Sequence, residues 1–259
     1  MDLVEAKRPV GNRHPWELAR AAFFDRLILN CVSRKRPIRV LDVGCGDAWF
    51  GKQLLAKLPP GSELVGWDVA LDDELLGIFS QDLPSGMSLT NRQPEGIFDL
   101  LLLMDVIEHV ADDRALLVDV KSRYLKQGGQ ILITVPAWMR LFSAHDLALR
   151  HYRRYTPKTG LALINATDLA VLRKGGLFHA LAIVRALQVL RSGQVEPLAD
   201  PGLYSSESER IGLGTWNAPT VVTKLVSLVL ELEGLVSQGA SVLGLELPGL
   251  SWWALCTKR

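Results

Sequence analysis

Histidine and carboxylate side chains follow two apolar runs of this sequence. His109 comes shortly after the run 98–104, and His145 with Asp146 follows the run 130–135. If the two runs are neighbouring parallel strands, these side chains meet at one edge of the sheet. Imidazole titrates near neutral pH and can remove a proton from a hydroxyl or an activated carbon. We therefore predict His145 and Asp146 as a catalytic pair. His109 is a second catalytic candidate or a backbone-bonding residue at a helix start.

A second polar group lies in the run 150–155, which contains His151 and Arg154. These two residues either anchor the loop through carboxylate pairs or hold an acidic group of the acceptor. Trp16, at the start of a predicted helix, is taken as a third substrate-binding residue. Oxygen and nitrogen donors occur in these segments without a tight ligand spacing, so no metal site is predicted; they are Asp105, Glu108, His109 and His145.

The stretch 39–48 indicates how a ligand is held. Its apolar residues, up to Val43, suit a strand that is covered on both faces. Gly44 and Gly46 then let the backbone turn tightly and approach a ligand where a Cβ atom would clash. A helix that begins here points unpaired N–H groups into the crevice. The spacing differs from a dinucleotide fingerprint, because Trp49 stands where its third glycine would be.

The pattern Asp42-x-Gly44-x-Gly46-x-Ala48 instead resembles motif I of the class I S-adenosylmethionine (SAM)-dependent methyltransferases. Ala48 stands where a third glycine is common, and alanine can often satisfy the close packing for which that glycine serves. Three later segments are similar to further parts of the same family and come in the same order: 63–69, 98–110 and 126–136. The segment 142–156 resembles a bacterial-type branch of small-molecule methyltransferases, in which F-S-x-H-D precedes H-x-R-R-Y.

This resemblance implies that SAM is the cofactor and assigns its contacts. Asp68, at the end of the second predicted strand, would accept hydrogen bonds from the ribose hydroxyls. Asn91 would contact the adenine, and Asp42 would act on the methionine ammonium directly or through water. The cofactor-binding residues predicted in this way are Asp42, Gly44, Cys45, Gly46, Asp68, Val69, Asn91, Asp105 and Val106.

Strand-like and helix-like segments alternate along the chain, which predicts an α/β fold with a mostly parallel, Rossmann-like, doubly wound sheet. The resemblance implies the seven-stranded sheet of the class I fold. The predicted strands lie near 38–43, 63–68, 87–91, 98–104, 130–135, 168–173 and 252–257. The predicted helices lie near 14–33, 47–57, 72–80, 112–125 and 157–166.

An apolar helical insertion, 174–251, separates the last two predicted strands. It contains two helix-like runs, 177–190 and 221–245, joined by a polar loop. Charged residues interrupt both runs, so neither is predicted to span a membrane. Three interpretations stay open: core helices, a cap over a lipophilic acceptor, and a surface for peripheral membrane contact or a homodimer. We expect residues 1–259 to form a single domain with this insertion as its cap.

The composition is that of a folded α/β protein. The chain has 259 residues, of which 48% are hydrophobic and 22% are charged, so it can bury a sizeable core. Its net charge of +1 argues against nucleic acid as a partner. Three widely spaced cysteines form no metal-type or disulfide pattern, and the first residues lack the apolar core of a signal peptide. A cytoplasmic location is expected.

The sequence therefore predicts an enzyme that transfers a methyl group from SAM to oxygen or carbon of a small, lipophilic acceptor. One alternative is a non-catalytic SAM- or nucleotide-binding module with an apolar partner surface. The histidines predicted beside the acceptor argue against it, because a pure binding module would not need them. A second alternative is a nicotinamide-dependent reductase. Trp49 and the lack of a Tyr-x-x-x-Lys pair argue against it.

Overall fold

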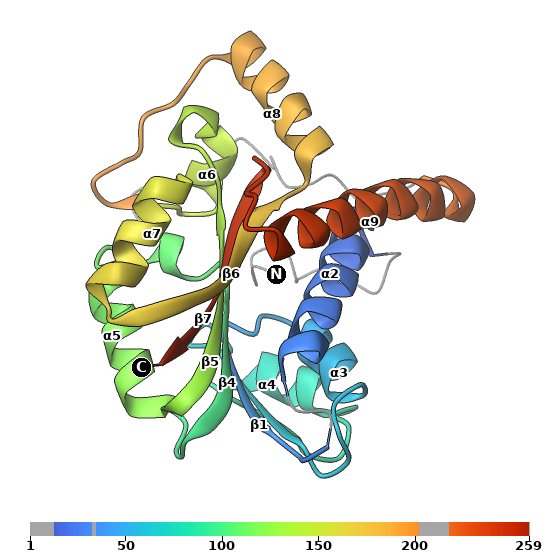
Figure 1. Cartoon of the computed structure of the whole chain (residues 1–259), viewed down its shortest axis with the longest axis vertical. Helices are drawn as coiled ribbons and strands as arrows, with labels where there is room; N and C mark the ends of the chain where they lie inside the picture. Colours follow the sequence, from blue (N-terminus) through green and yellow to red (C-terminus); the bar gives the residue numbers. More distant parts are fainter. Residues whose placement is uncertain (1–12, 33–34, 202–217, 259) are drawn as a thin grey trace.

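The computed structural model describes residues 13–32, 35–201 and 218–258, and Figure 1 shows their arrangement. In these ranges seven strands form one sheet in the order β3-β2-β1-β4-β5-β7-β6. The first five strands are parallel, and β7 runs antiparallel to both of its neighbours, β5 and β6. The strands are β1 (Arg39–Val43), β2 (Glu63–Trp67), β3 (Met87–Thr90), β4 (Phe98–Met104), β5 (Leu125–Pro136), β6 (Leu169–Leu177) and β7 (Ser251–Lys258).

Helices cover both faces of the sheet (Figure 1). They are α2 (Pro15–Cys31), α3 (Trp49–Leu55), α4 (Asp73–Ser80), α5 (Asp113–Tyr124), α6 (Ala144–Ala148), α7 (Pro157–Ala166), α8 (His179–Ser192) and α9 (Thr220–Val242). Two short 3₁₀ turns, η1 (Ile107–His109) and η2 (Met139–Leu141), follow β4 and β5. Figure 1 shows α2, α3 and α9 on one side of the sheet and α5 and α7 on the other.

The core has two layers because successive strand residues point to opposite faces. Val40 packs with the apolar residues of α2, α3 and α9, whereas its neighbour Leu41 packs with those of α5 and α7. Leu100 and Leu101 of β4 divide in the same way. All four are fully buried, which explains why the central strands read as unbroken apolar runs.

The strand order creates the position for a ligand. From β1 the chain moves outward to β2 and β3, and it then returns to the other side of β1 as β4. The connections therefore diverge between β1 and β4, which is the point where open α/β sheets bind ligands at the carboxyl ends of their strands. The segments predicted to carry chemistry, after β1, β2, β4 and β5, all reach this edge.

The predicted doubly wound sheet and its seven strands are confirmed. Two strand boundaries differ by more than one residue: β5 begins at Leu125, before the expected run 130–135, and β6 continues to Leu177. The segment between the last two strands is therefore 178–250 and not 174–251. It contains α8 and α9, at the places of the two predicted helix-like runs. Their role as a cap stays a prediction.

Helix α9 has an unusual distribution of side chains. Its buried positions are mostly small or polar, namely Thr223, Ser227, Leu230, Gly234, Ser237 and Ser241. Its exposed positions include large apolar residues such as Leu225, Leu232 and Leu235. Ser227 and Gln238 bond to backbone oxygens of Pro15 and Phe23, so the small-residue side packs on α2. Among the described helices, none has the length and apolar character needed to cross a membrane.

Candidate cofactor and acceptor site

A cavity of about 470 Å³ opens at the carboxyl ends of β1, β2, β4 and β5. This volume lies within the range typical of small-molecule sites. Its wall includes residues predicted for the cofactor and residues predicted for the acceptor. Among those predicted, the lining contains Trp16, Gly44, Asp68, Val69, Asp105, Val106, His109, His145 and His151. The structure thus brings these residues into one site.

The turn after β1 has the geometry that the glycines were predicted to provide. Gly44 has a φ of +69°, a left-handed conformation that side chains rarely adopt. A Cβ atom at Gly44 would lie 2.6 Å from Cγ2 of Val106. The Gly44 amide donates to the Trp67 carbonyl at 2.7 Å, and the Gly46 amide donates to Oδ2 of Asp68 at 3.0 Å. These bonds hold the ends of β1 and β2 together on one side of the cavity.

Ala48 adopts a conformation that its predicted packing role does not explain. It is fully buried, as close packing requires, but it also has a φ of +61° at the start of α3. The glycine common at this position in the family would therefore relieve backbone strain as well as allow close packing. Alanine retains the turn at an energetic cost.

Asp105 lies at the end of β4 and is tied to α2 and β5. Arg20 reaches its Oδ2 at 2.5 Å, and the hydroxyl of Thr134 donates to its Oδ1 at 2.8 Å. Arg20 also donates to Thr134, at 2.8 Å. Burial would raise the pKa of Asp105, but the charge of Arg20 and the Thr134 bond outweigh it and lower the pKa. Asp105 therefore presents a carboxylate to the cavity.

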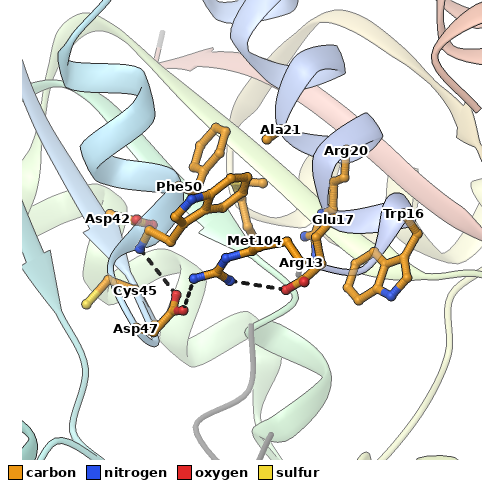
Figure 2. Close-up of a pocket in the computed structure, with 12 residues that line it drawn as sticks. Arg13, Trp16, Glu17, Arg20, Ala21, Asp42, Cys45, Asp47, Phe50 and Met104 are labelled. Carbon is orange, nitrogen blue, oxygen red and sulfur yellow. Dashed lines mark hydrogen bonds and ion pairs between the residues drawn. The ribbon is translucent and has the colours of Figure 1, made fainter. Parts of the chain in front are cut away.

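A smaller pocket of about 50 Å³ lies beside the glycine turn (Figure 2). Arg13 crosses it and forms ion pairs with Asp47 and, at 3.3 Å, with Glu17. The Arg13 guanidinium also lies 4.4 Å from the centre of the Trp49 ring. Asp42 and Cys45, both predicted for the cofactor, line this pocket. Arg13 thus lies between a carboxylate of α2, Glu17, and a carboxylate of the turn after β1, Asp47.

Asp42 is buried at the end of β1. Burial raises the pKa of Asp42 to about 7, and the nearby negative charge of Asp68 adds to this effect. A bound cation would favour the ionised carboxylate, because an opposite charge lowers the pKa of an acid.

Three histidines line the acceptor side of the cavity: His109, His145 and His151. The rings of His109 and His151 lie edge to face, with centroids 4.6 Å apart. His145 lines the same cavity from α6. His14 is outside the lining and caps α2, where its Nδ1 accepts a bond from the Trp16 amide at 3.3 Å.

Asp146, which was predicted as the catalytic partner of His145, does not line the cavity. It is fully buried, and its Oδ1 lies 3.0 Å from Nδ1 of His151 and 2.7 Å from Nε of Arg154. Burial would raise the pKa of Asp146, but the bonds to these two residues hold it well below the ordinary value. The Asp146 carboxylate therefore orients His151 and serves as a positioning group, because its partners keep it away from the cavity.

Arg154 anchors the loop, which is one of the two roles predicted for it. Besides its bond to Asp146, it donates to the Ala137 carbonyl at 3.1 Å, and its side chain is buried. Arg185 of α8 approaches the same carboxylate at 3.5 Å. The charged residue that interrupts the apolar run of α8 therefore points inward and connects this helix to α6.

Glu108 is the least expected member of the site. It is fully buried, and within the described part of the chain neither of its carboxylate oxygens has a hydrogen-bond partner. Burial, followed by the negative charge of Asp105, raises its pKa well above the ordinary value. Glu108 forms a cluster with His109 and His151. Each residue offers one possible ligand atom, and these three atoms lie within 4.8 Å of one another.

The structure also shows where sequence reasoning fell short. Asn91 is outside both pockets, and its amide donates to the Leu71 carbonyl at 2.9 Å, so its adenine contact stays a prediction. Gly46 does not line either pocket but is bonded to Asp68. Arg13 and Arg20 were missed as site residues. A signal for Arg20 was available, because a charged residue occupies a position of α2 that is buried among apolar side chains.

The fold and the cavity define this protein as a class I methyltransferase. Residues 16–175 match the family model described as "Methyltransferase domain", and the chain belongs to this family.

Three relatives illustrate the range of similarity. The match to a ubiquinone biosynthesis O-methyltransferase of Xylella fastidiosa is 28% identical and covers 50% of this chain and 56% of that protein. An S-adenosylmethionine-dependent methyltransferase from Mesorhizobium loti has a TM-score of 0.55 at 12% identity, over 93% of this chain and 100% of that one. The [4+2]-cyclase SpnF has a TM-score of 0.56 at 13% identity, over 100% of this chain and 93% of that one. Matches to the curated relatives span 50% to 64% of their lengths.

SAM is the cofactor of this class, and the residues present suit it. Gly44 lines the cavity without a side chain, at a position where a Cβ atom would clash with Val106. The acids Asp42, Asp68 and Asp105 surround the crevice, and they complement a ligand that carries an ammonium and a sulfonium charge. The chemistry of the cavity therefore agrees with the family.

Proposed function

We propose that this protein transfers a methyl group from SAM to a hydroxyl oxygen of a small acceptor. The observation that carries the proposal is a single cavity that joins the glycine turn and Asp68 to three histidines. The printed name of the Xylella relative, an O-methyltransferase, supports oxygen as the attacking atom in preference to carbon. Fold similarity alone would not suffice, because a cyclase shares this fold.

The cofactor side of the cavity would hold SAM in an orientation set by charge. Asp68 would accept hydrogen bonds from the ribose, and Val69 and Asn91 would lie toward the adenine. Arg13 and Asp42 both line the smaller pocket, where Arg13 would bind the carboxylate of the methionine end and Asp42 its ammonium, whose charge would favour the ionised form of Asp42. When bound, SAM supplies a methyl group on a sulfonium, which an oxygen nucleophile displaces in line.

The acceptor side would position the hydroxyl and take its proton. We assign the base to His145, which lines the cavity from α6. His109 and His151 would hold the acceptor oxygen, with His151 oriented by Asp146. Trp16 offers an apolar wall, and its ring packs edge to face on Phe178 next to α8, with centroids 6.4 Å apart. Such a site acts mainly by alignment and by exclusion of water.

We also propose that the acceptor is lipophilic and that α8 and α9 serve its delivery. Both helices expose large apolar side chains, among them Leu190 at 80% and Val221 at 78%. Peripheral membrane contact and a homodimer are two ways to cover such a surface. The three free cysteines support the proposed cytoplasmic location.

Two measurements test the function. Calorimetry with SAM, NADH and NADPH should give binding of SAM alone; preferential binding of a nicotinamide cofactor would favour the reductase alternative. A panel of phenols, catechols and long-chain alcohols should then be incubated with SAM that carries a deuterated methyl group. Mass spectrometry should show a labelled O-methyl product for at least one acceptor. Binding of SAM without any product would favour the non-catalytic alternative.

A further inference from the structure

The orphaned carboxylate of Glu108 points to a function beyond packing. Burying a carboxylate without a partner is costly, and native structures seldom leave both of its oxygens unsatisfied. Glu108 is fully buried, and among the described residues neither oxygen has a side-chain partner or a well-formed hydrogen bond; its own backbone N–H is the one donor near enough to favour the charged form. A structural glutamate at this position would be expected to find a hydrogen bond.

We propose that Glu108, His109 and His151 bind a divalent transition-metal ion on the acceptor side of the cavity. One donor atom from each residue lies within 4.8 Å of the other two, so small side-chain movements would let one ion contact all three at about 2.1 Å. The ion would give the Glu108 carboxylate a partner that the described residues do not provide.

The backbone prepares this cluster. Glu108 and His109 share the turn η1, and the Tyr152 amide donates to the Glu108 carbonyl at 2.8 Å, which fixes His151 beside that turn. In the neutral ring, donation from Nδ1 of His151 to Asp146 leaves the lone pair on Nε2. A carboxylate that orients a histidine ligand through its other nitrogen is a common outer-shell arrangement in metal sites.

The donor set selects the kind of ion. Two imidazoles and one carboxylate suit Zn²⁺, Fe²⁺ or Co²⁺, whereas Mg²⁺ and Ca²⁺ prefer oxygen ligands alone. Three protein ligands leave a coordination position open, and all three residues line the cavity. An acceptor hydroxyl could take that position, so that His109 and His151 would hold the acceptor oxygen through the ion and not by direct hydrogen bonds. This last step rests on the proposed function, whereas binding of the ion does not.

The test uses the whole 259-residue chain without a tag, after treatment with a chelator. Titration with Zn²⁺ in the absence of SAM should show one ion per chain, with Mg²⁺ binding far more weakly. In Glu108→Gln, which keeps the shape and removes the charge, Zn²⁺ affinity should fall by more than the roughly 10–100-fold that loss of an outer-shell partner costs. His179→Ala is the matched control, because His179 bonds the Pro248 carbonyl outside the cavity. It should retain the wild-type affinity.

A second measurement separates a lost ligand from a lost fold. The thermal unfolding midpoint of the wild type should rise with added Zn²⁺, and that of Glu108→Gln should not. If Glu108→Gln binds Zn²⁺ as the wild type does, or if the wild type binds no ion, the metal site is wrong. Methyl transfer that persists in chelator would refute the ion's part in the reaction and leave the proposed function intact. Zn²⁺ binding without methyl transfer under any condition would refute the proposed function and leave the metal site intact.

Discussion

Replacement of Gly44 by alanine tests the cofactor side of the site most directly. The residue has a φ of +69°, and a left-handed conformation costs a side chain about 1–2 kcal/mol. The new Cβ atom would meet Cγ2 of Val106 at 2.6 Å, and such overpacking costs about 1–3 kcal/mol. Because alanine also loses less backbone entropy on folding, we expect a net loss of about 2–4 kcal/mol in the free energy of unfolding.

The same substitution should also weaken cofactor binding. Val106 lines the cavity, so a shift that accommodates the new methyl group changes the wall against which SAM would lie. We expect SAM affinity to fall at least about 10-fold, which corresponds to about 1.4 kcal/mol. Calorimetry with SAM measures the affinity, and denaturant unfolding of the cofactor-free protein measures the stability.

Gly77→Ala is the control. Gly77 lies in α4, is exposed, and has no atom within 4 Å of the position that its Cβ would take. Alanine there should stabilise the protein by about 0.5–1 kcal/mol, because it favours the helix. If Gly44→Ala behaves like Gly77→Ala in both assays, the turn after β1 does not approach the cofactor and the assignment of the site is refuted.

Three further predictions concern single side chains. Asp68→Ala should weaken SAM binding by about 1–3 kcal/mol in calorimetry through lost ribose hydrogen bonds; full affinity would remove that role. His145→Ala should lower the turnover of an identified acceptor by about 10²–10⁴-fold and leave SAM affinity nearly unchanged, whereas the reverse pattern would move His145 to the cofactor side. Burial raises the pKa of Asp42 to about 7 from 3.8, so the folded state holds this proton more tightly than the unfolded state does. The resulting stability is present at low pH and is lost as the pH rises through about 7. Between pH 5 and pH 8 the cofactor-free wild type should therefore lose about 2–3 kcal/mol more unfolding free energy than Asp42→Asn, and equal losses would show that Asp42 titrates normally.

Most of the fold could be predicted because its signals are local. The parallel strands β1, β2 and β4 are short apolar runs that end in glycine or acidic residues, and period and composition suffice to place them. The position of Asp68 could be predicted for the same reason. A residue directly after a parallel strand lies at the crevice whichever way its side chain points. The bounds of the last strand pair were less accurate, since pairing with β7 and not local propensity extends β6 to Leu177.

The partners of side chains in loops could not be predicted. Asp146 is adjacent to His145 in sequence and yet orients His151, because the first turn of α6 directs its carboxylate inward. Arg185 interrupts an apolar run, which reads as a solvent-exposed position. In the structure it approaches Asp146 from α8. Both outcomes depend on contacts between segments far apart in the chain, and periodicity carries no information about them.

Asp105 and Glu108 show how far such contacts decide chemistry. The two acids are three residues apart after β4, so their sequence context is nearly the same, and both line the same cavity. Arg20 and Thr134 reach Asp105 and lower its pKa, whereas burial without a partner among the described residues raises the pKa of Glu108. One acid is therefore a fixed charge, already neutralised by an arginine, and the other is available to a cation. Since a metal ion competes with such pairing, the proposed site lies at Glu108 and not at Asp105, although the sequence alone showed both only as oxygen donors and predicted no metal site.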